Sequence, residues 1–182
     1  QNKIEESVYA LLKELILGEE YFKQNFTILQ SSIRCNTTQS EFIFFGLHRS
    51  IDEVVGLQNI NATWCEEAHS IQEKEWNKLR PTILRQENSF CIMVFNPQYD
   101  TDFVYRNFVM KKREDTLVRH INYTDNPFLS NSAKDLIAMD KKHLDEDTFN
   151  HIYLGYPRSE NEESFIKRSW IDACIDAHIK LS

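Results

Sequence analysis

The sequence predicts an α/β fold in which a mainly parallel sheet is flanked by helices. Strand-like runs alternate with helix-like patterns along most of the 182 residues. Residues 90–95 form a continuous apolar run of strand length, which is typical of a strand buried on both faces of a parallel sheet. A shorter strand-like run at 60–65 ends in two adjacent carboxylates, Glu66 and Glu67. Ligands of open α/β folds bind at the carboxyl ends of strands, so this edge is the first candidate site.

The first quarter of the chain predicts a helix followed by antiparallel strands. Apolar residues recur at helical spacing over residues 4–16, which indicates an amphipathic helix. Residues 26–29 and 32–35 are short extended segments, and a turn-rich stretch separates the second of them from a strand at 41–45. The pair formed by 32–35 and 41–45 is expected to be a β-hairpin that decorates the parallel sheet.

The remaining segments follow the alternating pattern. We expect a strand at 60–65 and a short helix at 70–79 that Pro81 interrupts and that residues 82–84 could continue. Further on we expect a strand at 90–95, a helix at 103–108, a strand at 116–123, and helices at 131–143 and 146–153. Asp102, and also Asp100, could cap the helix at 103–108. Polar residues 157–164 are typical of a linker, and the tail at 169–181 has the spacing of a short helix.

Composition excludes several classes of protein. The net charge of −7 argues against a protein that coats nucleic acid, so any DNA contact must be local. No segment approaches the roughly 20 apolar residues that a membrane span requires. Four cysteines are widely spread without a CxxC pair, which favours reduced thiols over a disulfide framework or a zinc site. The chain lacks an initiating Met, so we expect a fragment of a longer protein.

The acidic pair and a polar residue after the next strand form one constellation. In nucleotide hydrolysis, Glu66 could help hold Mg²⁺ and Glu67 could activate the attacking water. Acidic residues also occur in a first helical turn because they offset its positive dipole end. Asn96 ends the apolar run and could sense a phosphate or the attacking water, although Asn-Pro is also a common turn dipeptide.

The order and spacing of short segments resemble those of the phage terminase large subunit, in the PBSX-type group of short-tailed phages. The segments that carry the resemblance are Glu5–Tyr9, Ser40–Leu47, Trp64–Ala68, Arg80–Arg85, Phe95–Pro97, Asp102–Phe108, Tyr123–Leu129 and Ile152–Gly155. Together they run through nearly the whole chain.

The resemblance implies a P-loop NTPase-like fold of the ASCE type and a role as an ATP-driven viral DNA-packaging motor. By the family pattern, Glu66 matches the Mg²⁺-associated Walker B acid and Glu67 the catalytic glutamate. Asn96 falls in the segment that couples hydrolysis to movement. Arg49 and Arg85 are candidates for an arginine that stabilises charge during phosphoryl transfer. ATP and Mg²⁺ are the implied cofactors of the full-length protein.

The resemblance also implies a domain plan and partners. Residues 1–156 correspond to the part of the ATPase domain after the Walker A loop, with a small helical lid region, and 157–182 to a linker leading toward a nuclease domain. Implied partners are double-stranded phage DNA, the portal protein and the small terminase subunit, with a ring homo-oligomer acting in the bacterial host cytoplasm and no membrane association. The chain contains no G-x-x-x-x-G-K-[ST], so we expect the P-loop upstream of Gln1, the nuclease domain after Ser182, and little ATP affinity in this chain alone.

Two other functions stay open from the residues. A non-enzymatic phage assembly adaptor could keep a degenerate ATPase fold, which would account for the missing glycine-rich loop. A metal-dependent nuclease could use Glu66, Glu67, Asp100 and Asp102, because paired acids can hold two metal ions.

Overall fold

The computed structural model describes residues 8–158, except for the side chains of residues 47–50. The described residues form a mixed α/β protein with two compact units. The first unit contains residues 8–61 and 77–89, and the second contains 62–76 and 90–158.

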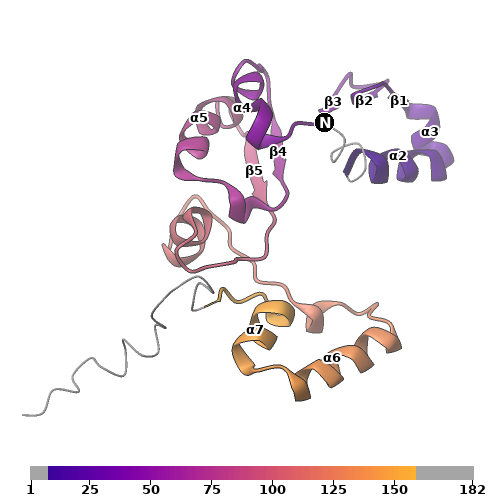
Figure 1. The fold of residues 1–182 in the computed structure, drawn as a ribbon. Helices are drawn as coiled ribbons and strands as arrows, with labels where there is room; N and C mark the ends of the chain where they lie inside the picture. The colour runs from indigo at the N-terminus through magenta and orange to yellow at the C-terminus, as the bar shows by residue number, and fades with distance from the viewer. Residues whose placement is uncertain (1–7, 159–182) are drawn as a thin grey trace, which may run out of the picture. The chain divides into compact units, whose positions relative to one another are not determined.

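The first unit is built on a three-stranded antiparallel sheet. Its elements are α2 (Val8–Gly18), α3 (Glu20–Asn25), β1 (Phe26–Ile28), β2 (Ser32–Cys35), β3 (Glu41–Ile43) and α4 (Leu47–Val55). The strands follow one another in the order β1-β2-β3 (Figure 1), and Ile33 of the central strand pairs with Ile28 on one side and Phe42 on the other. The predicted hairpin is therefore confirmed, and β1 adds a third strand to it.

One face of helix α2 contacts the segments that adjoin this sheet. The Tyr9 hydroxyl donates to the Leu29 carbonyl at 2.6 Å, and the Tyr9 ring meets the Phe44 ring edge-on at 5.3 Å between centroids. Ile16 and Ile33 are buried, whereas Leu11 and Leu15 are exposed. The helix predicted at 4–16 is thus present over Val8–Gly18, and its apolar residues are spread over both of its faces.

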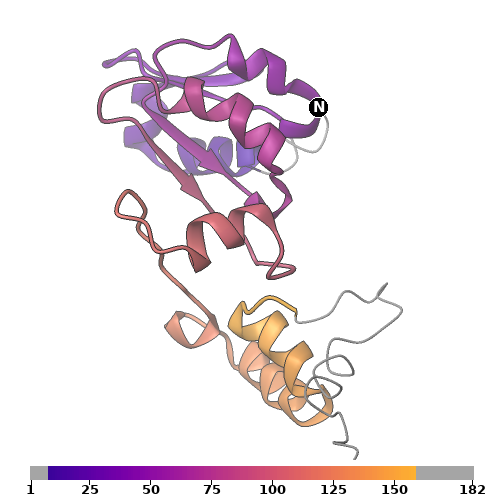
Figure 2. The same cartoon turned by 90° about the vertical axis from the view of Figure 1, so that its left-hand side faces the viewer.

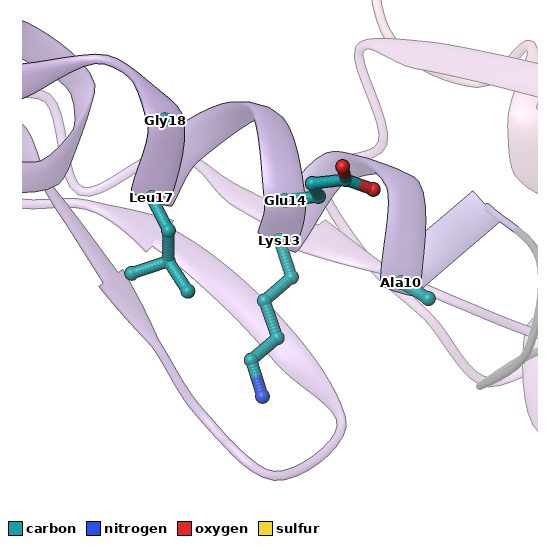
Figure 3. Close-up of a pocket in the computed structure, with 5 residues that line it drawn as sticks. All are labelled: Ala10, Lys13, Glu14, Leu17 and Gly18. Carbon is teal, nitrogen blue, oxygen red and sulfur yellow. The ribbon is translucent and has the colours of Figure 1, made fainter.

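A hollow of about 480 Å³ lies along α2. Its lining comes from this helix alone, and Figure 3 shows the Lys13 and Leu17 side chains projecting from the same side of it. A surface with one lysine, one glutamate and no second element offers no convergent polar groups, so it is not a candidate active site.

The Cys35 thiol at the end of β2 is the most acidic cysteine that the structure describes. Hydrogen bonds from the Thr37 hydroxyl, 3.3 Å from the sulfur, and from Thr38 lower its pKa to about 6.

The low pKa of Cys35 predicts how its alkylation depends on pH. Because the thiolate is the reactive form, we expect the rate of alkylation by iodoacetamide to rise between about pH 5 and pH 7. An ordinary thiol, with a pKa of about 8.5, would react mainly at higher pH. Peptide mapping by mass spectrometry would follow the reaction, with the buried Cys65 as an internal control. Thr37→Val should move the midpoint to higher pH, and a wild-type midpoint above about 8 would contradict the expectation.

The second unit contains a two-stranded parallel sheet and a helical pair. Its elements are β4 (Ala62–Cys65), β5 (Phe90–Met93), a π-helical turn (Tyr105–Met110), a 3-10 turn (Tyr123–Asp125), α6 (Asn131–His143) and α7 (Glu146–Leu154). Helix α5 (Glu73–Ile83) begins in this unit and ends in the first. Strands β4 and β5 lie side by side, as do α6 and α7 (Figures 1 and 2).

Helices α6 and α7 match the helices predicted at 131–143 and 146–153, and local capping explains why. Ser130 accepts from the Ala133 N–H at the start of α6, and Asp145 accepts from the Thr148 N–H at the start of α7. The Thr148 N–H also holds the pKa of the Asp145 carboxyl below its usual range. Gly155 ends α7 with φ +70°, a conformation that glycine adopts without strain.

The structure corrects four predictions. The sheets are not mainly parallel, because three of the five described strands form the antiparallel sheet. Pro81 does not interrupt a helix, because α5 continues through it to Ile83. Residues 116–122, where a strand was predicted over 116–123, have no regular secondary structure and join neither sheet.

The fourth correction concerns the apolar run at 90–95. Strand β5 occupies Phe90–Met93, but it is not buried on both faces, because Phe90, Ile92 and Val94 are exposed. Trp64 of β4 is likewise exposed, so one face of the parallel pair is uncovered in the described residues. The linker predicted at 157–164 lies mostly outside the described residues, and the short helix predicted at 169–181 lies entirely outside them. In the part of the chain that the structure describes, no helix is long and apolar enough to span a membrane.

Candidate functional site

The predicted acidic pair lies at the carboxyl end of β4, opposite the end of β5. Parallel pairing aligns Cys65 with Met93. Beyond that pair, the Val94 N–H donates to the Cys65 carbonyl at 2.9 Å, and the Val94 carbonyl accepts from the Ala68 N–H at 3.1 Å. Glu66 and Glu67 therefore lie between two backbone hydrogen bonds to one residue of the neighbouring strand, which fixes where their side chains leave the backbone.

Glu67 adopts a left-handed backbone conformation, with φ 50° and ψ 39°. Its carbonyl accepts from the Ser70 N–H at 3.1 Å and from the Ser70 hydroxyl at 2.9 Å, and these bonds close a short 3-10 turn. Residues with a Cβ rarely adopt this conformation, and such strain is concentrated at functional sites. The Glu67 side chain is 78% exposed and is thus available to a ligand.

The strain at Glu67 predicts a difference between two variants that remove the same carboxylate. Glu67→Gly should be more stable than Glu67→Ala by about 1 kcal/mol, because only glycine adopts the left-handed region without steric cost. Urea unfolding of both variants would measure the difference. Equal stabilities would mean that position 67 leaves the left-handed region at no cost.

Glu66 is held by the indole of Trp64. The Trp64 Nε1–H donates to Glu66 Oε1 at 2.7 Å. Glu66 is the first residue after β4, where the chain enters the turn, and the indole of Trp64 on the strand reaches it there. Within the described part of the chain, Glu66 Oε2 has no recorded partner and can meet another ligand.

Glu67 has a different neighbour, the His69 ring. Glu67 Oε2 lies 3.4 Å from His69 Nδ1, and the His69 side chain is 17% exposed. The Nδ1 atom is buried and lacks a hydrogen bond to any residue that the structure describes. The contact is within ion-pair distance but not in hydrogen-bond geometry.

A hollow of about 400 Å³ opens beside His69, between the segments that follow β4 and β5. His69, Ser70 and Ile71 contribute from the first segment, and Gln98, Tyr99 and Asp102 from the second. Asn96 is exposed near the beginning of the second segment, two residues after Val94, and no hydrogen bond links its side chain to Glu66 or Glu67 in the described residues. The strands thus bring the segments that carry Glu66, Glu67 and Asn96 to one edge, without direct contact between Asn96 and the acids.

The two candidate arginines belong to the first unit. Arg49 lies on α4. Arg85 follows α5 and donates from Nε to the Pro81 carbonyl at 3.3 Å, so its guanidinium is partly used in ending that helix.

Glu66 fits the chemistry of a magnesium ligand. Mg²⁺ keeps several of its waters and is held by one or two carboxylates together with substrate phosphates, and one anchored carboxylate with a free oxygen can serve such an ion. The residues for holding the phosphates themselves are missing, since residues 1–182 contain no glycine-rich loop followed by Lys and Ser or Thr.

The acids named for a nuclease do not form a metal cluster. Asp102 Oδ2 accepts from the Gln98 and Tyr99 N–H groups at 3.2 and 3.0 Å, so it closes the loop before the helix rather than capping the helix itself. Within residues 8–158, no three His, Cys, Asp or Glu side chains are placed to share a metal ion.

The thiols of Cys65 and Cys91 lie on the covered face of the parallel pair. Their sulfur atoms are 4.0 Å apart, well beyond the roughly 2.05 Å of a disulfide, and Cys35, Cys65 and Cys91 are all free thiols. The hydrogen bond with the Cys65 sulfur, together with burial, raises the pKa of the Cys91 thiol. Cys174 lies outside the described residues.

Sequence reasoning missed Trp64 and His69, which contact the two acids. For Trp64 a signal was present, because it lies only two residues before Glu66 in the sequence. For His69 no simple pattern applies, because its approach to Glu67 depends on the left-handed turn.

The second unit thus defines an α/β protein with a carboxylate pair on a strained turn at the carboxyl edge of two parallel strands. A family model for the phage terminase large subunit matches residues 1–156. The chain belongs to this family, as the order of its motifs indicated, and this membership points to a role in phage DNA packaging. None of the curated proteins matches the chain.

Proposed function

We propose that this chain is the water-activating part of an ATPase that drives double-stranded DNA into a phage procapsid. The observation that carries the proposal is the carboxylate pair at the carboxyl edge of β4 and β5, in a chain of the terminase large subunit family. In a P-loop ATPase this edge faces the terminal phosphate of the bound nucleotide.

The two carboxylates differ in their surroundings, and the difference suggests their roles. Glu66 is anchored by Trp64 and would help hold Mg²⁺, which would neutralise charge on the phosphates. Glu67 is exposed, carries its side chain on a fixed turn, and accepts a proton from the attacking water. Asn96 lies on the adjoining segment, where it relays the state of the site to the loop after β5.

The other parts of the proposed motor follow from family membership. The phosphate-binding loop comes from polypeptide outside residues 1–182, and a nuclease domain is a further expected part of the complete gene product. Arg49 or Arg85 supplies a stabilising positive charge to its own or a neighbouring site in a ring of subunits. Portal protein, small terminase subunit and DNA are the proposed partners, in the cytoplasm of the bacterial host.

The test is an ATPase assay of the complete gene product that contains this chain. We expect phosphate release that requires Mg²⁺ and increases with double-stranded DNA. No phosphate release under any of these conditions would overturn the proposal and favour the alternative function, a non-enzymatic assembly adaptor with a degenerate ATPase fold. The observation that favours this alternative is the lack of a glycine-rich loop in residues 1–182.

A further inference from the structure

His69 stands out because it contacts the candidate catalytic carboxylate and has no other polar partner for one of its ring nitrogens. Its Nδ1 atom is buried, unbonded among the described residues, and 3.4 Å from Glu67 Oε2. A buried ring nitrogen normally has a hydrogen-bond partner. One without a partner lowers the stability of the folded state by about 1–3 kcal/mol. The Glu67 carboxylate is the acceptor within reach.

The backbone around this pair is already fixed. The Ala68 N–H is bonded to the Val94 carbonyl, and Ser70 is bonded twice to the Glu67 carbonyl, so residues 67–70 form a closed turn. The remaining freedom of Glu67 lies in its side chain, which is mostly exposed. A donor at its base would restrict that freedom and keep one carboxylate oxygen directed away from His69.

We propose that His69 is a positioning residue: its Nδ1–H donates to Glu67 Oε2 and thereby orients the carboxylate toward the attacking water. The inference rests on the proposed ATPase function for its catalytic consequence, but the contact itself is a property of this chain. Loss of this orientation should leave the affinity for ATP unchanged, because the carboxylate does not hold the nucleotide. It should instead slow the chemical step. Misplacement of a reacting group by about 1 Å can cost up to 100-fold in rate.

Two variants of His69 separate a hydrogen-bond role from a packing role. His69→Leu keeps apolar bulk and removes the donor, whereas His69→Asn places an amide N–H close to the position of Nδ1. In the complete gene product we expect His69→Leu to lower kcat about 10-fold with KM for ATP unchanged, and His69→Asn to restore most of kcat. Wild-type kcat in His69→Leu, or equal loss in both variants, would overturn the proposal.

A second measurement does not depend on ATP turnover. Nitrogen-15 NMR of the histidine rings in this chain reports which ring nitrogen carries the proton, and we expect Nδ1 to carry it in His69. Glu67→Ala should change the His69 signals and leave those of His151 unchanged, because His151 Nδ1 contacts the Tyr156 carbonyl instead. Unchanged His69 signals in Glu67→Ala would contradict the proposed hydrogen bond between His69 and Glu67. If the wild-type gene product hydrolyses no ATP, the proposed function fails, and the NMR result alone decides on the contact.

Discussion

Glu67→Gln in the complete gene product is expected to abolish ATP turnover and to leave ATP binding intact. Glutamine has the shape of glutamate and fits the same turn, but its amide cannot take a proton from water. Loss of a general base costs about 10²–10⁴-fold in rate. Steady-state phosphate release would measure kcat, and equilibrium binding of a labelled nucleotide would measure affinity.

The control for this variant is Glu146→Gln. Glu146 is an exposed carboxylate in the first turn of α7, and it lies on the same unit as Glu67 but not at the hollow beside His69. It should keep the wild-type kcat, since removing it costs no more than a favourable charge at a helix N-terminus. Normal turnover in Glu67→Gln would exclude Glu67 as the base and would leave Glu66 as the remaining carboxylate of the pair.

Trp76→Ala is expected to destabilise the protein by about 3–5 kcal/mol, which is a large part of the 5–15 kcal/mol that typically separates folded from unfolded states. Trp76 is 7% exposed and meets the Phe108 ring edge-on at 5.2 Å, and Phe108 in turn contacts Phe103 at 6.3 Å and the Arg113 guanidinium at 5.0 Å. This aromatic cluster joins α5 to the π-helical turn, so truncation leaves a cavity where the two elements meet.

Trp64→Ala is the matched control, because it removes the same side chain from an exposed position. Trp64 is 59% exposed, and its loss should change the free energy of unfolding by less than about 1 kcal/mol. Urea midpoints of the two variants would measure the contrast. Similar midpoints would contradict the assignment of Trp76, rather than Trp64, to the core.

Local signals in the sequence were sufficient for the elements that local chemistry determines. Ser130 and Asp145 cap α6 and α7 as expected of their residue types, and the turn-rich stretch before Glu41 produced the predicted hairpin. The order of strands also brought Glu66 and the segment of Asn96 to one edge, as the alternating pattern predicted.

Predictions that depend on tertiary surroundings failed for identifiable reasons. A proline is expected to break a helix, but Pro81 lies in α5 where flanking residues Thr82 and Ile83 are buried, and that burial favours continuing the helix. The apolar residues at 90–95 indicated a strand buried on both faces, but apolar composition cannot specify whether a second layer covers it. Residues 116–122, which form no strand, show the same limit, because strand propensity does not supply a pairing partner.

The division of the described residues into units has a practical consequence for anyone who wishes to produce one of them separately. The polypeptide passes between the units three times, after residues 61, 76 and 89, so no single truncation isolates either one. A recombinant fragment beginning at Ala62 would keep Thr82 but lose Val55, whose carbonyl accepts from the Thr82 hydroxyl at 3.3 Å, and it would leave Lys78 without Asp52. The second unit can therefore be produced by replacing residues 77–89 with a short joining peptide. The first unit requires a fragment in which residues 77–89 are joined to residues 8–61 by a linker.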